Sequence, residues 1–166
     1  MRTTFAAPTR RFSPRTDRKL NIRRATPDDI PEMMRIEQSS GNAAHWSEQR
    51  YRDLFNESAP RRLALVMEEQ GIAAFLVASI ANADCEIENV VVLEDRRRLG
   101  LGRNLLIELL DQARREQATS IFLEVRESNL AARKLYENFG FHQTAVRPRY
   151  YSHPEEDAIL YRFEIK

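Results

Sequence analysis

A glycine-containing turn near the middle of the chain has the residue types of an anion-binding site. It reads RRLGLGR over residues 97–103 and lies between an expected strand and an expected helix. The two glycines allow the backbone to turn sharply and to come close to a ligand. Free N–H groups and the dipole at the start of a helix attract anions, and the neighbouring arginines add positive charge. The turn therefore predicts a site for a phosphate or a pyrophosphate.

Three phosphate-binding patterns can be compared with this turn. A Walker loop requires Gly-Lys followed by Ser or Thr, which the residues after Gly102 do not supply. A dinucleotide-binding fingerprint requires a third glycine where the chain has Leu105. The pattern R/Q-x-x-G-x-G, which holds the pyrophosphate of coenzyme A, is matched by Arg97, Gly100 and Gly102. A glycine-rich turn with solvated arginines is the alternative interpretation.

Two further side chains have the chemistry to move protons. Glu124 interrupts the apolar residues of a strand expected after the helix that follows the turn. A carboxylate partly buried beside a cleft suits a general base, and the alternative is an exposed glutamate paired with Arg126. Tyr136 shares a helical face with Phe139, and by itself it would be more typical of a core aromatic residue.

The elements that position these residues follow from periodicity and turn chemistry. The predicted strands span residues 20–25, 62–68, 72–80, 85–92, 121–125, 142–146 and 158–165. A first helix begins after its cap at Thr26, and the other helices span residues 47–56, 104–116 and 129–139. Strands come first and then alternate with helices, which predicts an α/β protein with a mixed sheet covered by helices.

Composition limits the classes of function. The chain has 166 residues, 42% hydrophobic and 31% charged, with a net charge of +1. These values suit one globular domain and give no electrostatic argument for nucleic-acid binding. The single cysteine, Cys85, lies in an expected strand and is predicted to be a small core residue, which fits a reducing cytoplasm. Neither it nor the three histidines have metal-ligand spacing, so no metal is expected.

Residues 1–19 differ from the rest of the chain. They hold six basic residues, one acid and two prolines, and few large apolar residues. We therefore expect a disordered basic tail before a domain that spans residues 20–166. A transit peptide and a tail that contacts ribosomal RNA or another anion are alternatives. No apolar run approaches the roughly 20 residues that span a bilayer, so no membrane association is expected.

The stretch 88–161 resembles the GNAT superfamily of acetyl-CoA-dependent N-acetyltransferases. Within it the chain is most similar to the RimI branch, which acetylates the N-terminal alanine of a small-subunit ribosomal protein. The matching segments are EN-VVV (88–92), RRLGLGR (97–103), LEVRESN (123–129), LYENFGF (135–141), RYY (149–151) and EDAILY (156–161). The resemblance implies the acyl-CoA N-acyltransferase fold, a central, mostly antiparallel sheet with helices on both faces.

The resemblance also implies roles for individual residues. Glu124 would act as general base, through a water molecule, and Tyr136 would protonate the departing thiolate of coenzyme A. The glycine turn would aim the thioester at a pocket between two splayed strands, and a bulge in strand 85–92, which the sequence does not reveal, would free an N–H for the acetyl oxygen. Asn129 would cap its helix and contact the cofactor. The implied cofactor-binding residues are Val90, Val91, Val92, Arg97, Arg98, Leu99, Gly100, Leu101, Gly102, Arg103 and Asn129.

Acceptor selection is expected from the first helices and the C-terminal hairpin. Trp46 would form an apolar wall for a small first residue, and Tyr150 and Tyr151 would hydrogen-bond the peptide backbone. Packing is the alternative role for each. Three candidate acids near the amine pocket, for which a solvated position is favoured, are Glu37, Glu88 and Asp157.

The predicted activity is direct acetyl transfer from acetyl-CoA to the N-terminal alanine amine of a small-subunit ribosomal protein in the cytoplasm. Alternatives are a lysine side chain or small-molecule amine as acceptor, a non-catalytic acyl-CoA-binding module, and a nucleic-acid adaptor that uses the basic tail. The N-terminal extension departs from the family pattern and leaves the acceptor open. The oligomeric state and any activating partner are also open.

Overall fold

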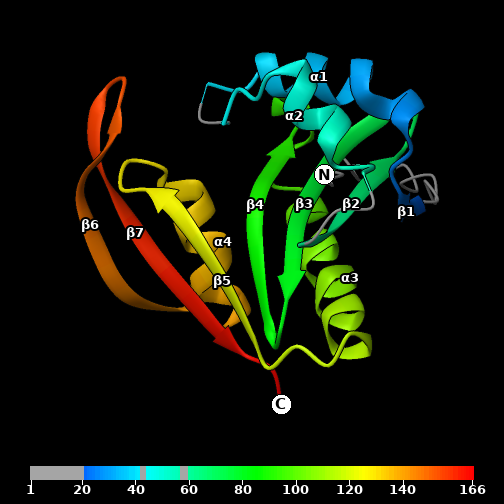
Figure 1. Ribbon diagram of the computed structural model, residues 1–166. Coiled ribbons are helices and arrows are strands. Elements are labelled where there is room, and N and C mark those ends of the chain that lie inside the picture. Colours follow the sequence, from blue (N-terminus) through cyan, green and yellow to red (C-terminus); the bar gives the residue numbers. More distant parts are fainter. Residues whose placement is uncertain (1–20, 42–43, 57–59) are drawn as a thin grey trace, which may run out of the picture.

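The computed structural model describes residues 21–41, 44–56 and 60–166. Its seven strands form one sheet in the order β1-β2-β3-β4-β5-β7-β6 (Figure 1). The strands are β1 (Asn21–Arg24), β2 (Arg61–Glu68), β3 (Ile72–Ala81), β4 (Asp84–Val92), β5 (Ser120–Arg126), β6 (His142–Ser152) and β7 (Glu155–Glu164). Among the strands of the described residues, β4 and β5 alone are parallel neighbours, so the predicted mostly antiparallel sheet is confirmed. The predicted tail 1–19 and the start of the first strand at residue 20 lie outside the described residues.

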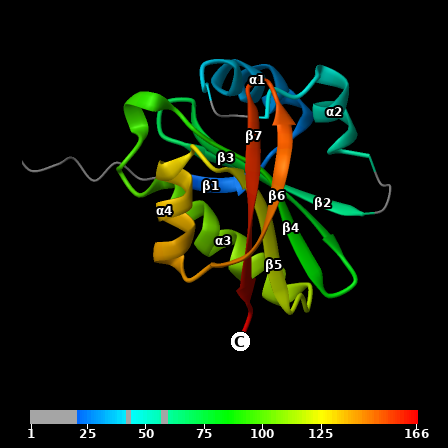
Figure 2. The same ribbon diagram turned by 90° about the vertical axis from the view of Figure 1, so that its left-hand side faces the viewer.

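Helices cover both faces of the sheet, as predicted (Figures 1 and 2). The α-helices are α1 (Ile30–Gln38), α2 (Glu48–Asp53), α3 (Leu101–Arg115) and α4 (Leu130–Phe139), and short 3-10 turns span Pro27–Asp29 and Glu94–Arg96. In the described part of the chain, no helix is long and apolar enough to cross a membrane.

Two cores form because side chains alternate across the strands. In β2, Leu63 and Leu65 belong to the core beneath α3 and α4, whereas Ala64 and Val66 belong to the core beneath α1 and α2. Cys85 lies fully buried in the first of these cores, which confirms its predicted role. Its burial raises the pKa of the thiol to about 12.

The parallel strands β4 and β5 separate along their length. They pair from Asp84 with Ser120 to Ile87 with Leu123, and beyond these residues they diverge (Figure 1). The register between β3 and β4 also shifts here, because Ala78 pairs with Ile87 and the preceding Val77 pairs with Asn89. Residue 88 is therefore the extra residue of a β-bulge in β4. The family resemblance implied a bulge in this strand, which the sequence itself did not reveal.

Several predicted boundaries differ from those observed. Helix α3 begins at Leu101 and not at residue 104, because Gly100 in the left-handed conformation, with φ 85° and ψ 5°, is its N-cap. Helix α2 is shorter than predicted, although Ser47 caps it by accepting the N–H of Arg50 at 3.3 Å. The last two strands form a longer hairpin than predicted (Figure 2). The prediction ended β6 too early because nearly all of this strand is exposed, so its sequence shows no apolar alternation.

Candidate active site

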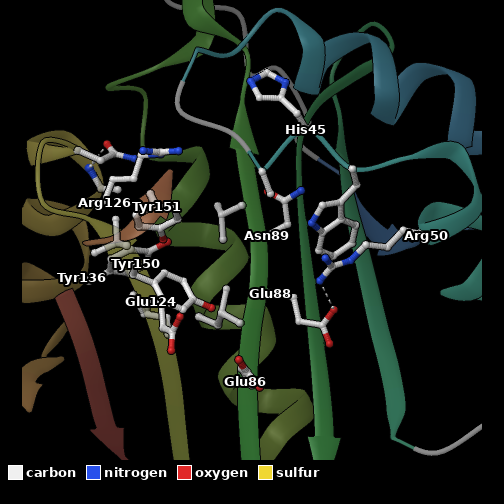
Figure 3. Close-up of a pocket in the computed structure, with 18 of the residues that line it drawn as sticks. His45, Arg50, Glu86, Glu88, Asn89, Glu124, Arg126, Tyr136, Tyr150 and Tyr151 are labelled. Atoms are coloured by element: carbon white, nitrogen blue, oxygen red, sulfur yellow. Dashed lines mark hydrogen bonds and ion pairs between the residues drawn. The ribbon is translucent and has the colours of Figure 1, made fainter. Parts of the chain in front are cut away.

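A cavity of about 700 Å³ opens where β4 and β5 diverge (Figure 3). It is lined by these two strands, by α4, by the end of β6 and by the segment that leads into α2. Seven residues predicted to be functional line it: Trp46, Val90, Glu124, Asn129, Tyr136, Tyr150 and Tyr151. The fold thus gathers both candidate catalytic residues and all three candidate acceptor-binding residues around one space.

Glu124 reaches this cavity from β5, on the side of the C-terminal hairpin. One of its carboxylate oxygens lies 2.6 Å from the guanidinium of Arg147, and the Glu124 side chain is 21% exposed. Arg126, the partner considered from the sequence, pairs instead with Glu156 at 3.3 Å, so that pairing was wrong. The ion pair fixes the position of the carboxylate at the cavity.

Tyr136 reaches the same cavity from α4. Its ring packs edge-on against Phe141 at 5.6 Å and only 6% of the residue is exposed, so it is a core aromatic residue as well as part of the lining. Burial, and secondarily Tyr151, raises the pKa of the phenol, which keeps the hydroxyl protonated. The helix is fixed at its start by Asn129, whose side-chain oxygen accepts the N–H of Ala132 at 3.2 Å.

The glycine turn forms the N-terminus of α3, outside the cavity lining. The N–H of Asn104 donates to the carbonyl of Gly100 at 3.0 Å, so the amides of residues 101–103 precede the first hydrogen bond of the helix. Such amides are available to an anion. Gly102 is required for another reason: a Cβ there would lie 2.9 Å from Cδ2 of Leu135. It lets α3 pack closely against α4.

The arginine of the predicted pyrophosphate pattern has a local structural role. Arg97 donates from Nε to the carbonyl of Val92 at 3.3 Å and from Nη2 to the hydroxyl of Ser40 at 3.1 Å. It therefore joins the end of β4 to the end of α1. The side chain of Val91 is buried in the core beneath α1 and α2, away from the cavity lining. The remaining turn side chains with exposed positions are Arg98, Leu99 and Arg103.

The candidate acceptor-binding residues combine packing with exposure to the cavity. The ring of Trp46 lies 5.6 Å from that of Tyr51 and carries the guanidinium of Arg50 3.9 Å above it. The rings of Tyr150 and Tyr151 meet edge-on at 5.2 Å. The pKa of Tyr150 is raised, first of all by its interaction with the carboxylate of Glu124.

The three candidate acids have different surroundings. Glu37 is 1% exposed and accepts the N–H of Trp46 at 3.0 Å and the amide of Asn89 at 2.7 Å, so the expected solvated position was wrong. Glu88, at the bulge, lines the cavity, where its side chain is mostly buried beside Arg50 and Arg62. On the hairpin, the carboxylate of Asp157 accepts a backbone N–H at 2.8 Å, and this residue does not line the cavity.

Two charged residues near the candidate base were not identified from the sequence. Glu86 lines the cavity, and its pKa is raised by burial and then by the charges of Glu88 and Glu124. The alternation of Glu86 and Glu88 along β4 was a signal that could have placed both at one surface. Arg147 gave no comparable signal, because the course of β6 beyond residue 146 was not predicted.

With this geometry established, the chain can be compared with known proteins. The model of the acetyltransferase (GNAT) family matches residues 30–141. A ribosomal protein bS18-alanine N-acetyltransferase from Salmonella typhimurium is 36% identical over 135 residues, which cover 80% of this chain and 88% of that protein.

Solved structures give the same result. The crystal structure of the ribosomal-protein-S18-alanine N-acetyltransferase from Escherichia coli matches with a TM-score of 0.78 and 33% identity, over 89% of this chain and 94% of that chain. Arabidopsis thaliana NAA60 in complex with acetyl-CoA matches with a TM-score of 0.78 over 89% of this chain and 99% of that chain. At 15% identity, the latter match concerns the fold alone.

Proposed function

The chain belongs to the acetyltransferase (GNAT) family and is an acetyl-CoA-dependent N-acetyltransferase, and we propose that its acceptor is the N-terminal alanine amine of a small-subunit ribosomal protein. The observation that carries this proposal is the meeting of Glu124 and Tyr136 at the cavity where β4 and β5 diverge. A proton acceptor and a proton donor at one cavity are what transfer from a thioester to an ammonium group requires. The names of the similar proteins from Salmonella and Escherichia coli support the choice of acceptor.

The residues at the start of α3 fit the diphosphate of acetyl-CoA. The amides of residues 101–103 lack acceptors within the helix, and Gly100 holds the left-handed conformation that exposes them. We assign the cofactor to these amides and to the strand segment 90–92, with Asn129 at the opposite side. Because the Arg97 side chain is engaged with Val92 and Ser40, we assign only its backbone to the cofactor. Arg98 and Arg103 supply exposed positive charge.

Proton transfer is assigned to two side chains of this cavity. Glu124 accepts the proton that the acceptor ammonium must lose before attack. Tyr136, which lines the same cavity, would face the departing sulfur of bound acetyl-CoA. The ordinary phenol pKa of ~10 exceeds the thiol value of ~8.5, and burial raises that of Tyr136 further, so full proton transfer is uphill. We therefore assign to Tyr136 a hydrogen bond to the developing thiolate, which lowers the barrier without complete transfer.

Recognition of the acceptor is assigned to Trp46 on one side of the cavity and to Tyr150 and Tyr151 on the hairpin side. Trp46 supplies an apolar surface suited to the methyl group of an alanine, and Tyr150 and Tyr151 supply hydroxyl groups for the peptide backbone. With a ribosomal protein as substrate, we propose that the enzyme acts in the cytoplasm. The domain 20–166 carries the activity, and the basic segment 1–19 is assigned no more than weak contact with nucleic acid.

The acceptor can be tested directly with a synthetic peptide. The peptide carries the N-terminal sequence of protein bS18, beginning at its alanine, and an internal lysine. After incubation with acetyl-CoA and the enzyme, mass spectrometry should locate the acetyl group on the alanine amine, and a peptide with a blocked N-terminus should stay unmodified. Acetylation of the lysine alone, or only of small amines added to the reaction, would refute the proposed acceptor.

The catalytic roles require a second test. Glu124→Gln and Tyr136→Phe should each lower kcat by at least ~10-fold. Acetyl-CoA binding, measured by calorimetry, should stay within about threefold of wild type, because neither residue lies at the start of α3. Binding of acetyl-CoA with no transfer to any amine would instead identify a non-catalytic acyl-CoA-binding module.

A further inference from the structure

Two side chains from β6 meet the carboxylate of Glu124. The guanidinium Nη1 of Arg147 lies 2.6 Å from Oε1 of Glu124, and the same carboxylate is the first cause of the raised pKa of the Tyr150 hydroxyl. Arg147 also lies over the ring of Tyr150, 5.5 Å from its centre. Figure 3 shows Tyr150 beside Glu124 at the cavity. The candidate base is therefore held from the C-terminal hairpin as well as from its own strand.

An irregularity in β6 makes this double contact possible. In a regular strand, residues 147 and 150 would point to opposite faces because their separation is odd. Here Arg147 pairs with Ala158 and Tyr151 pairs with Glu156, so residues 148–150 oppose Asp157 alone. The carboxylate of Asp157 accepts the N–H of Arg149 at 2.8 Å, and Arg149 has a φ of 52°. The resulting bulge brings both side chains to the face that carries Glu124.

The charges around Glu124 show why a cation is needed there. Glu86 faces it from β4 and, among the residues that the structure describes, has neither a hydrogen bond nor an ion pair. Its pKa is raised first by burial and then by the negative charges of Glu88 and Glu124. Like charges repel each other, so Glu86 is an unfavourable neighbour for the Glu124 carboxylate. Four groups face Glu124: Glu86 from β4, and Arg147, Tyr150 and Tyr151 from β6. Three further charged residues line the same cavity, namely Glu88, Arg50 and Arg126. Arg147 offsets the repulsion at Glu124 itself.

We propose that Arg147 is a positioning residue for acetyl transfer, which holds the Glu124 carboxylate oriented toward the cavity. The bulge at residues 148–150 is the device that delivers Arg147 and Tyr150 together. The inference rests on the proposed role of Glu124 as proton acceptor. It adds a function for the hairpin: besides bordering the acceptor side of the cavity, β6 orients the base.

The first test measures the carboxylate without any reaction. In protein labelled with ¹³C in its glutamate carboxyl groups, the Glu124 resonance is identified by its loss in Glu124→Gln. In Arg147→Gln its chemical shift at a fixed pH should change, because the ion pair at 2.6 Å is lost. Arg147→Lys should restore most of the wild-type chemical shift. An unchanged Glu124 resonance in Arg147→Gln would overturn the proposal.

The second test is a kinetic double-mutant cycle. Arg147→Gln should lower kcat about tenfold and change the KM for acetyl-CoA by less than about twofold. In the Glu124→Gln background the same substitution should have almost no further effect, because Arg147 acts through Glu124. Arg149→Gln removes a charge from the same bulge and should leave kcat unchanged.

The outcomes separate this inference from the proposed function. Losses that multiply in the double variant, or an equal loss in Arg149→Gln, would refute the role of Arg147. A Glu124→Gln enzyme with a normal rate would instead remove the proposed base. Acetylation of a different acceptor by the wild type would change the substrate but leave the cycle interpretable with that acceptor.

Discussion

Replacing Gly100 by alanine would place a side chain on the N-cap of α3, where the backbone has φ 85° and ψ 5°. No atom lies within 4 Å of the position that the new Cβ would occupy, so the substitution meets no steric obstacle from neighbouring residues. The whole effect must therefore arise from the backbone conformation. This makes Gly100 a clean site at which to test whether the turn holds a diphosphate.

The size of the effect on stability follows from two opposing contributions. An L-residue in the left-handed region costs about 1–2 kcal/mol. The restricted unfolded chain of an alanine variant returns about 0.4–1 kcal/mol. The free energy of unfolding should then fall by about 1 kcal/mol, which lowers the Tm of a chain of this length by about 2–4 °C.

The substitution should weaken acetyl-CoA binding by more free energy than it removes from folding. Relaxation of φ at Gly100 would rotate the following peptide group and turn the amides of residues 101–103 away from their common direction. Loss of one hydrogen bond to a charged group costs about 1.5–3 kcal/mol. The Kd for acetyl-CoA, measured by calorimetry, should therefore rise at least about tenfold.

Two further variants control this experiment. A Cβ added at Gly41 would also have no atom within 4 Å, but Gly41 lacks a positive φ, so Gly41→Ala should leave both Tm and Kd nearly unchanged. Gly100→Asn should lose less stability than Gly100→Ala, because asparagine tolerates the left-handed region better. If Gly100→Ala lowers the Tm as expected while the Kd stays at the wild-type value, the amides of this turn do not bind the diphosphate.

Three other substitutions test the packing and the buried groups. Gly102→Ala would place a Cβ 2.9 Å from Cδ2 of Leu135. Overpacking should cost about 1–3 kcal/mol and the gain in helix propensity should return about 1 kcal/mol, so the free energy of unfolding in urea should fall by about 1 kcal/mol. An unchanged unfolding midpoint would mean that α4 moves aside without cost. Glu37 accepts hydrogen bonds from two buried donors, and in Glu37→Gln one of these donors would face an NH₂ group. The free energy of unfolding should fall by about 1–2 kcal/mol in the same assay, and an equally stable variant would contradict this hydrogen bonding. Because the folded pKa of Cys85, about 12, exceeds the ordinary value of 9.0, the folded state keeps a proton that the unfolded state loses, and the free energy of unfolding should fall as pH rises above 9. Between pH 9 and 10.5 the wild type should lose about 2 kcal/mol more than Cys85→Ala, and parallel pH profiles would contradict this.

The order of strands and helices was predictable because most elements have a strong local signal. In α3, Leu105, Leu106 and Leu109 recur at helical spacing, and all three are buried. Gly140, predicted to end α4, has a φ of 112° there. The boundary of α3 was missed by one turn because periodicity marks the buried face of a helix, whereas its start depends on the conformation of a single glycine.

The site was predictable to the extent that single strands and helices carry it. Glu124 and Tyr136 belong to regular elements, and the fold brings both to one cavity. The contact between Glu124 and Arg147 depends instead on an irregularity in an exposed strand. No pattern of apolar residues records that irregularity, because exposed side chains on an edge strand are under little constraint from packing.

The bulge at Glu88 is also an irregularity that no pattern of apolar residues records, and it affects both cores of the protein. Before it, Cys85 and Ile87 face the core beneath α3, and after it Val90 and Val92 pack against that same core. Without the extra residue, the side-chain period of two would place Asn89 on that face and Val90 on the other. Asn89 would then be unable to donate to Glu37 beneath α1. One inserted residue thus lets β4 complete both cores while it diverges from β5, and the cavity between these strands depends on it.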